Sequence, residues 1–123
     1  MQVSQKLQLA RDLVAEGWIT GGYVSRGIGG QLRYCARGAL NKAFLGRATS
    51  EPEMTPDDEM RLAERLVAEA MHGPLIDGSD WRAIRRAITT WNDNRAGANP
   101  KLHVVSAFDT AIARCKRLEA GAR

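Results

Sequence analysis

Residues 18–34 read WITGGYVSRGIGGQLRY, and this stretch decides the fold because it interrupts an otherwise helical sequence. It holds five of the twelve glycines, and each glycine inside a helix costs roughly 1 kcal/mol relative to alanine. Two short β-prone pieces, residues 23–24 and 32–34, flank a glycine turn, so this stretch could form either a small hairpin or a loop. A lone hairpin is marginally stable, so we expect Trp18, Ile19 and Tyr23 to anchor it against helices.

Helices are predicted on both sides of this insert, residues 17–34. Before it, apolar residues at steps of three and four predict a first helix over residues 3–16, and Gly17 is suited to a left-handed position at its end. After it, the apolar pattern from Cys35 to Phe44 predicts a second helix that Gly46 could end. Gly38 lies inside that helix, which indicates that another backbone approaches it closely.

A third helix is predicted over residues 56–72 and carries many acids. A polar loop at residues 49–55 precedes it, with Thr55 as the N-cap and Pro56 as the first helical residue. Gly73 and Pro74 are expected to end it.

Two more helices follow the connector at residues 75–79. Ser79 is the expected cap of the fourth helix, whose apolar face is formed by Trp81, Ile84, Ile88 and Trp91. Residues 92–99 are expected to form a loop, and Asn99 with Pro100 opens the last helix. Residues 120–123 are expected to be a flexible tail.

Together these patterns predict a mainly α fold, one compact domain of about five helices spanning residues 1–123, with the Gly-rich hairpin or loop between the first two. A chain of 123 residues can bury a core of its own. No apolar run reaches the ~18 residues of a membrane span, and the first ten residues lack the apolar core of a secretory signal. We therefore expect a cytoplasmic protein with no membrane association.

The net charge of +4 hides a strong segregation along the chain. Residues 1–50 carry seven cations and two anions, residues 51–80 carry two and nine, and residues 81–123 carry nine and three. The net charges are therefore +5, −7 and +6, so the acidic middle could neutralise the basic ends within the protein. Fourteen of the 18 cations are arginine, which reflects either codon bias in a GC-rich genome or a use for arginine forks in anion binding.

Several short motifs resemble a known family. They are LARDLV at residues 9–14, GW at 17–18, CARGAL at 35–40, WND at 91–93, VV at 104–105 and DTAI at 109–112. Together they resemble a family of small uncharacterised proteins from actinobacteria and their bacteriophages, over about residues 7–113. The family has no assigned activity, so the resemblance implies relatives rather than chemistry. The chain departs from the family pattern at residues 99–101, where Asn-Pro-Lys replaces a threonine and acids.

The first candidate site is an anion site at the Gly-rich stretch. Arg26, Arg33 and Arg37 could clamp a small anionic ligand near the start of the second helix, and Asn92 and Asp93 could lie at the mouth of the same pocket. The alternative is a surface turn with a helix end, because neither a Walker motif nor a dinucleotide fingerprint is present.

The second candidate is a cysteine nucleophile. Cys35 precedes a helix, where a thiol pKa can be lowered, and His72 or His103 could act as its base. The alternative is a pair of buried thiols, Cys35 and Cys115, without a catalytic role. The spacing of cysteines and histidines matches no metal site, and no motif predicts a cofactor.

The third candidate is a basic surface. Arg82, Arg85 and Arg86 share one helix face, and Arg114 and Arg117 share another. Side by side, the two faces would form a strip able to bind nucleic acid. The alternative is a set of ion pairs to the acidic third helix.

These observations favour a non-enzymatic accessory protein, which a phage could encode, that binds a host protein or a small anionic ligand. A nucleotide or nucleic-acid binder is the alternative, and a cysteine hydrolase is a second alternative.

Overall fold

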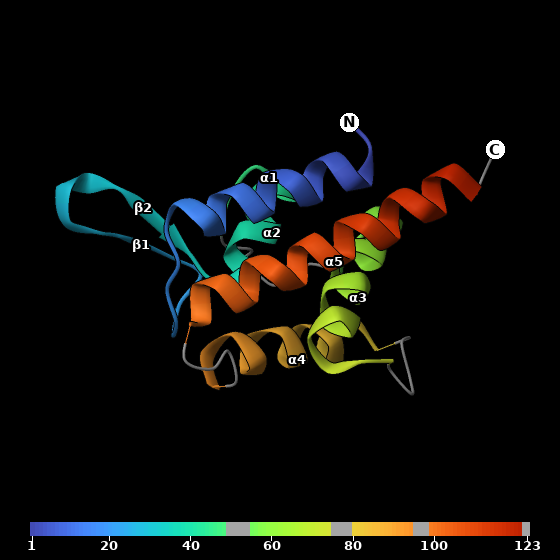
Figure 1. Ribbon diagram of the computed structural model, residues 1–123. Coiled ribbons are helices and arrows are strands. Elements are labelled where there is room, and N and C mark those ends of the chain that lie inside the picture. The colour runs from blue at the N-terminus through green and yellow to red at the C-terminus, as the bar shows by residue number, and fades with distance from the viewer. Residues whose placement is uncertain (49–54, 75–79, 95–98, 122–123) are drawn as a thin grey trace.

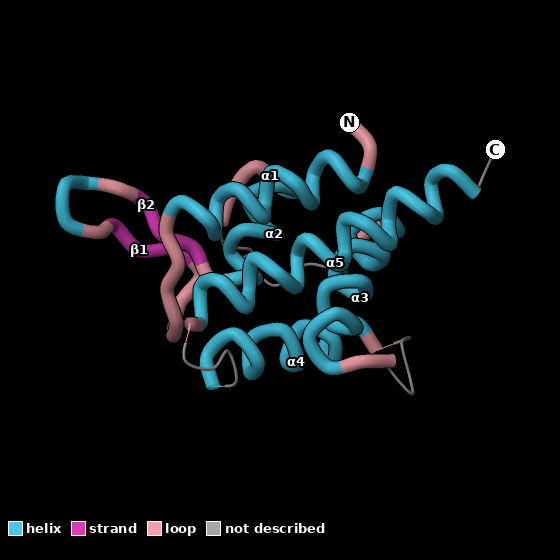
Figure 2. The backbone as a smooth tube through the Cα atoms, in the orientation of Figure 1, coloured by secondary structure: helices cyan, strands magenta, loops and turns pink. Residues whose placement is uncertain are grey.

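The computed structural model describes residues 1–48, 55–74, 80–94 and 99–121 of the chain. Within these ranges it contains five α-helices and one antiparallel hairpin, as Figure 2 shows. The helices are α1 (Val3–Glu16), α2 (Ala36–Leu45), α3 (Asp58–His72), α4 (Trp81–Asn94) and α5 (Pro100–Gly121). The predicted mainly α fold is therefore confirmed, and of the two predicted forms of the Gly-rich stretch the structure has the hairpin.

The helices pack through the apolar faces that the sequence predicts. The long α5 packs against α1 on one side and α3 on the other, while α2 contacts α1 and α4. Figure 1 shows α1 and α5 crossing the molecule beside each other, with α4 along the opposite edge. The fully buried side chains at the centre include Leu7, Leu40, Val67, Ile88 and Phe108.

The hairpin consists of β1 (Val24–Arg26) and β2 (Leu32–Tyr34), which are joined by a 3-10 turn at Ile28–Gly30. Its tip projects away from the helices (Figure 1). Its base is held by Tyr34, which is buried and whose amide donates to the Gly17 carbonyl at 2.8 Å. Trp18 packs against the core beside it, as expected of an anchor.

Gly38 in α2 allows the close backbone approach that its position in the sequence predicts. A Cβ atom there would lie 2.6 Å from the Tyr23 carbonyl carbon and would overlap the carbonyl oxygen. The Tyr23 carbonyl also accepts a hydrogen bond from the Cys35 amide at 3.3 Å. The loop before β1 therefore lies directly on the first turn of α2.

Of the two glycines predicted to end helices, Gly17 needs correction and Gly46 does not. Gly17 has a φ of −171°, which is extended rather than left-handed. Its lack of a side chain instead admits β2, because a Cβ there would lie 2.9 Å from the Leu32 carbonyl oxygen. Gly46 does end α2 in the left-handed conformation, with a φ of 81°.

The start of α3 and the end of α4 also differ from the prediction. Asp57, rather than Thr55, is the N-cap of α3, and its carboxylate accepts from the Met60 amide at 2.8 Å. The fourth helix continues to Asn94, so Asn92 and Asp93 lie in its last turn and not in a loop.

Some predictions fall outside the described residues. These are residues 49–54 and 95–98 of the two predicted loops, the connector with its Ser79 cap, and the end of the tail at residues 122–123. Next to the connector, the Asp80 carboxylate caps α4 by accepting from the Arg82 and Ala83 amides at 3.0 and 3.3 Å. Residues 120 and 121 of the predicted tail belong to α5.

Candidate anion-binding site

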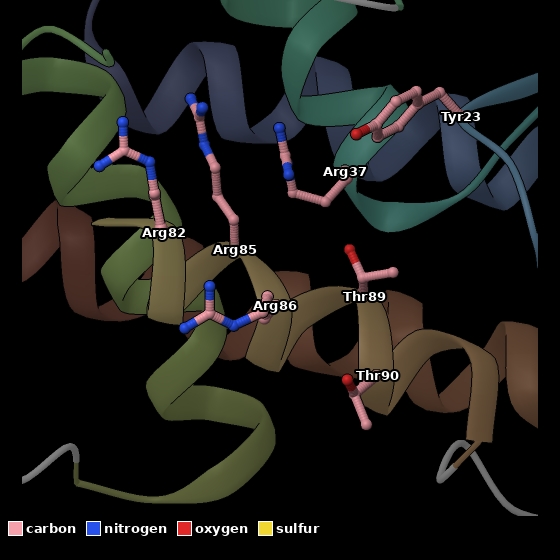
Figure 3. A pocket seen from close by; sticks show the side chains of 7 residues that line it. All are labelled: Tyr23, Arg37, Arg82, Arg85, Arg86, Thr89 and Thr90. Atoms are coloured by element: carbon pink, nitrogen blue, oxygen red, sulfur yellow. The ribbon is translucent and has the colours of Figure 1, made fainter. Parts of the chain in front are cut away.

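Four arginines converge on one open pocket between α2 and α4. We call it the arginine pocket, and its volume is about 400 Å³. Figure 3 shows Arg82 and Arg85 of α4 in a row with Arg37 of α2, and the row ends at Tyr23. Arg86, Thr89 and Thr90 also lie on α4. The described residues that line the pocket are Tyr23, Arg37, Arg82, Arg85, Arg86, Thr89 and Thr90, and none of them is acidic.

The inner wall of the pocket is fixed by a buried carboxylate, Glu64 of α3. Its two oxygens accept from Arg85 Nε at 2.7 Å and Arg85 Nη2 at 3.0 Å, and Arg37 Nε lies 4.0 Å away. All three side chains are at most 3% exposed. A bidentate pair of this kind holds the guanidinium plane in one orientation. The acidic third helix therefore does attract the basic segments, as the charge segregation allows.

Aromatic rings position the guanidinium groups further. Arg82 and Arg85 lie 4.4 and 4.7 Å from the centre of the Trp81 ring, and Arg37 lies 5.5 Å from that of Tyr23. Contacts of a cation with the face of a ring are attractive at these distances. The row of arginines is therefore supported by rings near both of its ends.

The outer rim of the pocket carries its accessible charge. Arg82 and Arg86 are exposed, and Thr89 and Thr90 add two hydroxyl groups. Counted over the described residues alone, the four arginines and the carboxylate of Glu64 carry a net charge of +3. This surface suits a small anion, because guanidinium forks bind phosphate and carboxylate groups through paired hydrogen bonds.

A smaller hollow of about 220 Å³ adjoins the arginine pocket. It shares Tyr23 and Thr89 with that pocket, and its other lining residues are Gly21, Gly22, Cys35 and Asp93. Asp93 Oδ1 accepts from the Gly21 amide at 3.2 Å and from Asn92 Nδ2 at 3.0 Å. One end of the combined surface is thus cationic and the other carries a carboxylate.

Asn92 lies beneath these cavities and joins three segments of the chain. Its side-chain oxygen accepts from Trp18 Nε1 at 2.9 Å and from the Ala36 amide at 3.0 Å, and its Nδ2 donates to the Ile19 carbonyl at 3.1 Å. The residue is 1% exposed. It therefore positions the walls of the site rather than lying at a pocket mouth.

The remaining predicted arginines lie away from the arginine pocket. Arg26 donates to the Gly30 carbonyl at 2.8 Å within the hairpin, and Arg33 is exposed on β2. Arg114 and Arg117 belong to α5, which packs chiefly on α1 and α3. Arg37 thus joins the arginines of α4 rather than those of the hairpin or of α5.

Cys35 caps α2, where its sulfur accepts from the Gly38 amide at 3.3 Å. The residue is 5% exposed, and burial raises the pKa of its thiol. The two candidate bases have other surroundings. The ring of His72 hydrogen-bonds the Ala87 carbonyl at 2.9 Å, and His103 is exposed in the first turn of α5. A raised pKa and a buried sulfur both disfavour a nucleophilic thiolate.

Sequence reasoning missed Glu64, Tyr23, Thr89 and Thr90. Glu64 carried a usable signal, since it is an acid four residues after Met60 on the buried side of an amphipathic helix. Thr89 also carried one, because residues 82, 86, 89 and 93 recur at helical spacing on one face, and Thr90 follows Arg86 by four residues. Tyr23 offered no such signal, because only the fold of the loop brings it to α4.

The fold and the pocket define a small, mainly helical protein with an arginine-lined pocket. The model of a family of unknown function, DUF6197, matches residues 1–114, so the chain belongs to this family. No curated protein and no solved structure matches the chain. No helix among the described residues has the length and apolar character needed to cross a membrane. In the same part of the chain, no group of three or more His, Cys, Asp or Glu side chains could hold a metal ion.

Proposed function

We propose that this protein is a non-enzymatic binding protein for a small anionic ligand, which it holds in the arginine pocket. The observation that carries the proposal is the convergence of Arg37, Arg82, Arg85 and Arg86 on one hollow with no acid among its described lining residues. Arginine forks paired with threonine hydroxyls are a usual set of donors for phosphate and carboxylate groups.

The pocket is organised before a ligand arrives, which supports the proposal. Glu64 and the Trp81 ring already hold Arg85, and Trp81 also lies against Arg82. Binding then orders few side chains, and less of the interaction energy is lost to conformational entropy. The ligand would meet Arg82 and Arg86 directly, because these two are exposed at the rim.

A small ligand explains the geometry better than a nucleic acid does. A duplex binder spreads phosphate contacts over a continuous basic face, whereas these arginines gather around a pocket. Arg114 and Arg117 lie on a helix that packs chiefly on α1 and α3, and no residue of α5 is among those that line the pocket. The buried Cys35 thiol, with its raised pKa, supports a binding role over a hydrolase.

The cellular setting is part of the same proposal and rests on the family resemblance. It is an accessory role in the cytoplasm of an actinobacterium or of a phage-infected cell, with the bound anion or a host protein as the partner.

Titration with inorganic phosphate by isothermal calorimetry tests the proposal. The double variant Arg82→Ala/Arg86→Ala should lose binding, and Arg33→Ala/Arg117→Ala, which removes the same charge elsewhere, should keep it. Equal losses in both variants would show that the arginine pocket is not the site.

A further inference from the structure

We infer that the arginine pocket and the smaller hollow form one two-part site for a phosphate ester whose organic part carries hydroxyl or amino groups. The phosphate would lie among the arginines, and the donors of the organic part would bind Asp93. This inference rests on the proposed function, since it names the class of anion that the pocket takes.

The two cavities are neighbours on one face of α4. Tyr23 and Thr89 line both of them, so the cavities meet at these two side chains. Their volumes are about 400 and 220 Å³, and pockets for small ligands commonly measure about 300–1,000 Å³. A ligand larger than a bare anion would occupy both parts.

The charges along α4 predict which end of a ligand binds in each part of the site. Arg86 and Asp93 are seven residues apart, which is two helical turns or about 10 Å along the axis. An inorganic phosphate at Arg86 cannot reach Asp93 over that span, but a sugar or nucleoside phosphate can. The helix dipole acts in the same direction, because its positive end is near Arg82 and its negative end is near Asp93.

Asp93 has a carboxylate oxygen that can accept a hydrogen bond from a ligand. Its Oδ1 accepts from the Gly21 amide and from Asn92, and no described residue donates to its Oδ2. A carboxylate oxygen held in this way accepts well from a hydroxyl or an amino group. The same carboxylate would repel a second phosphate, which favours a monoester over a ligand with phosphates at both ends.

Three probes test the inference by calorimetry: inorganic phosphate, adenosine 5′-monophosphate and glucose 6-phosphate. We expect at least one ester to bind the wild-type protein at least tenfold tighter than inorganic phosphate, and the preferred ester shows whether the organic part is a nucleoside or a sugar. If both esters bind no tighter than phosphate, the two-part site is wrong although the arginine pocket stands. If none of the three binds, the proposed function itself fails.

The variant Asp93→Asn assigns the second part of the site. Its amide oxygen can still accept from Gly21, so the loop keeps its anchor, and thermal unfolding verifies this. The ratio of the affinity for the ester to the affinity for inorganic phosphate should fall at least fivefold. The affinity for inorganic phosphate itself should be unchanged or somewhat higher. Asp109→Asn, an exposed acid on α5, is the charge-matched control and should change neither. An undiminished ester preference in Asp93→Asn would overturn the inference.

Discussion

Arg85 binds Glu64 through both carboxylate oxygens, at 2.7 and 3.0 Å, and the pair is almost completely buried between α3 and α4. A buried pair of this kind is weak evidence for stability, since desolvation offsets much of its attraction. Its effect here is to fix the inner wall of the arginine pocket. It also joins the acidic third helix to the basic fourth one.

The first prediction concerns this pair. Glu64→Gln removes the carboxylate charge that faces Arg85 and Arg37, so two buried cations lose the attraction of that carboxylate. We expect the free energy of unfolding to fall by about 3–5 kcal/mol, measured by urea denaturation. Glu69→Gln is the control, because Glu69 forms an ion pair with Arg65 that is partly exposed and spans one helical turn. That change should cost about 0.5 kcal/mol or less. Equal effects of the two variants would contradict the buried role of Glu64.

A second prediction concerns Asn92. Replacing it with alanine leaves Trp18 Nε1, the Ala36 amide and the Ile19 carbonyl without a shared partner in a buried place. The expected loss is about 2–4 kcal/mol, with a lower Tm in a thermal scan. Asn94→Ala, two residues later in the same helical turn but exposed, should shift Tm little. A tolerated Asn92→Ala would mean that water replaces the amide.

Gly38→Ala gives a third prediction. Its methyl group would overlap the Tyr23 carbonyl, which cannot move without shifting the wall shared by both cavities. We expect a loss of about 3 kcal/mol in stability and weaker phosphate binding in the same protein. Gly22→Ala should keep its stability, because nothing lies within 4 Å of the position of its Cβ. A stable Gly38→Ala protein would show that the loop is not pressed against α2.

The fourth prediction concerns pH. The Ser4 hydroxyl donates to Glu119 Oε1 at 2.6 Å, and this bond is the main cause of the lowered pKa of Glu119. A carboxyl whose pKa is lower in the folded state stabilises the protein above its unfolded pKa and loses that effect as the pH falls through the folded value. Ser4→Ala should therefore cost about 1 kcal/mol near pH 7.

The difference between the wild-type and Ser4→Ala proteins should shrink as the pH falls below about 4.5, the ordinary pKa of a glutamate. Denaturation curves at pH 7 and at pH 3 measure it. Ser25→Ala, an exposed serine in β1, is the control and should show no such trend. A difference that stays constant between the two pH values would contradict the assignment to Glu119.

The helices could be predicted because their apolar residues recur at helical spacing. The first and last helices match the predicted starts at Val3 and Pro100, and a glycine inside a helical pattern correctly predicted the close contact at Gly38. Helix ends were less predictable. Thr55 and Asp57 are both acceptable caps for α3, and only tertiary context selects between them.

The candidate site could be predicted only in part, because its residues come from segments far apart in the chain. Helical spacing places Arg82 and Arg86 on one face, but it cannot show that Arg37 from α2 joins them. That meeting depends on α2 packing against α4 and on the shared partner Glu64. Nearness along the chain instead grouped Arg37 with Arg26 and Arg33, which the hairpin carries away from the pocket.

The most direct test of the central claim is the affinity for inorganic phosphate, measured at low and high salt. The proteins compared are the wild type, Arg82→Ala/Arg86→Ala and Arg33→Ala/Arg117→Ala. The account predicts binding by the wild-type protein that weakens with salt. It also predicts at least a tenfold loss in the first variant and less than a twofold change in the second. No measurable phosphate binding by the wild-type protein, or equal losses in both variants, would contradict it.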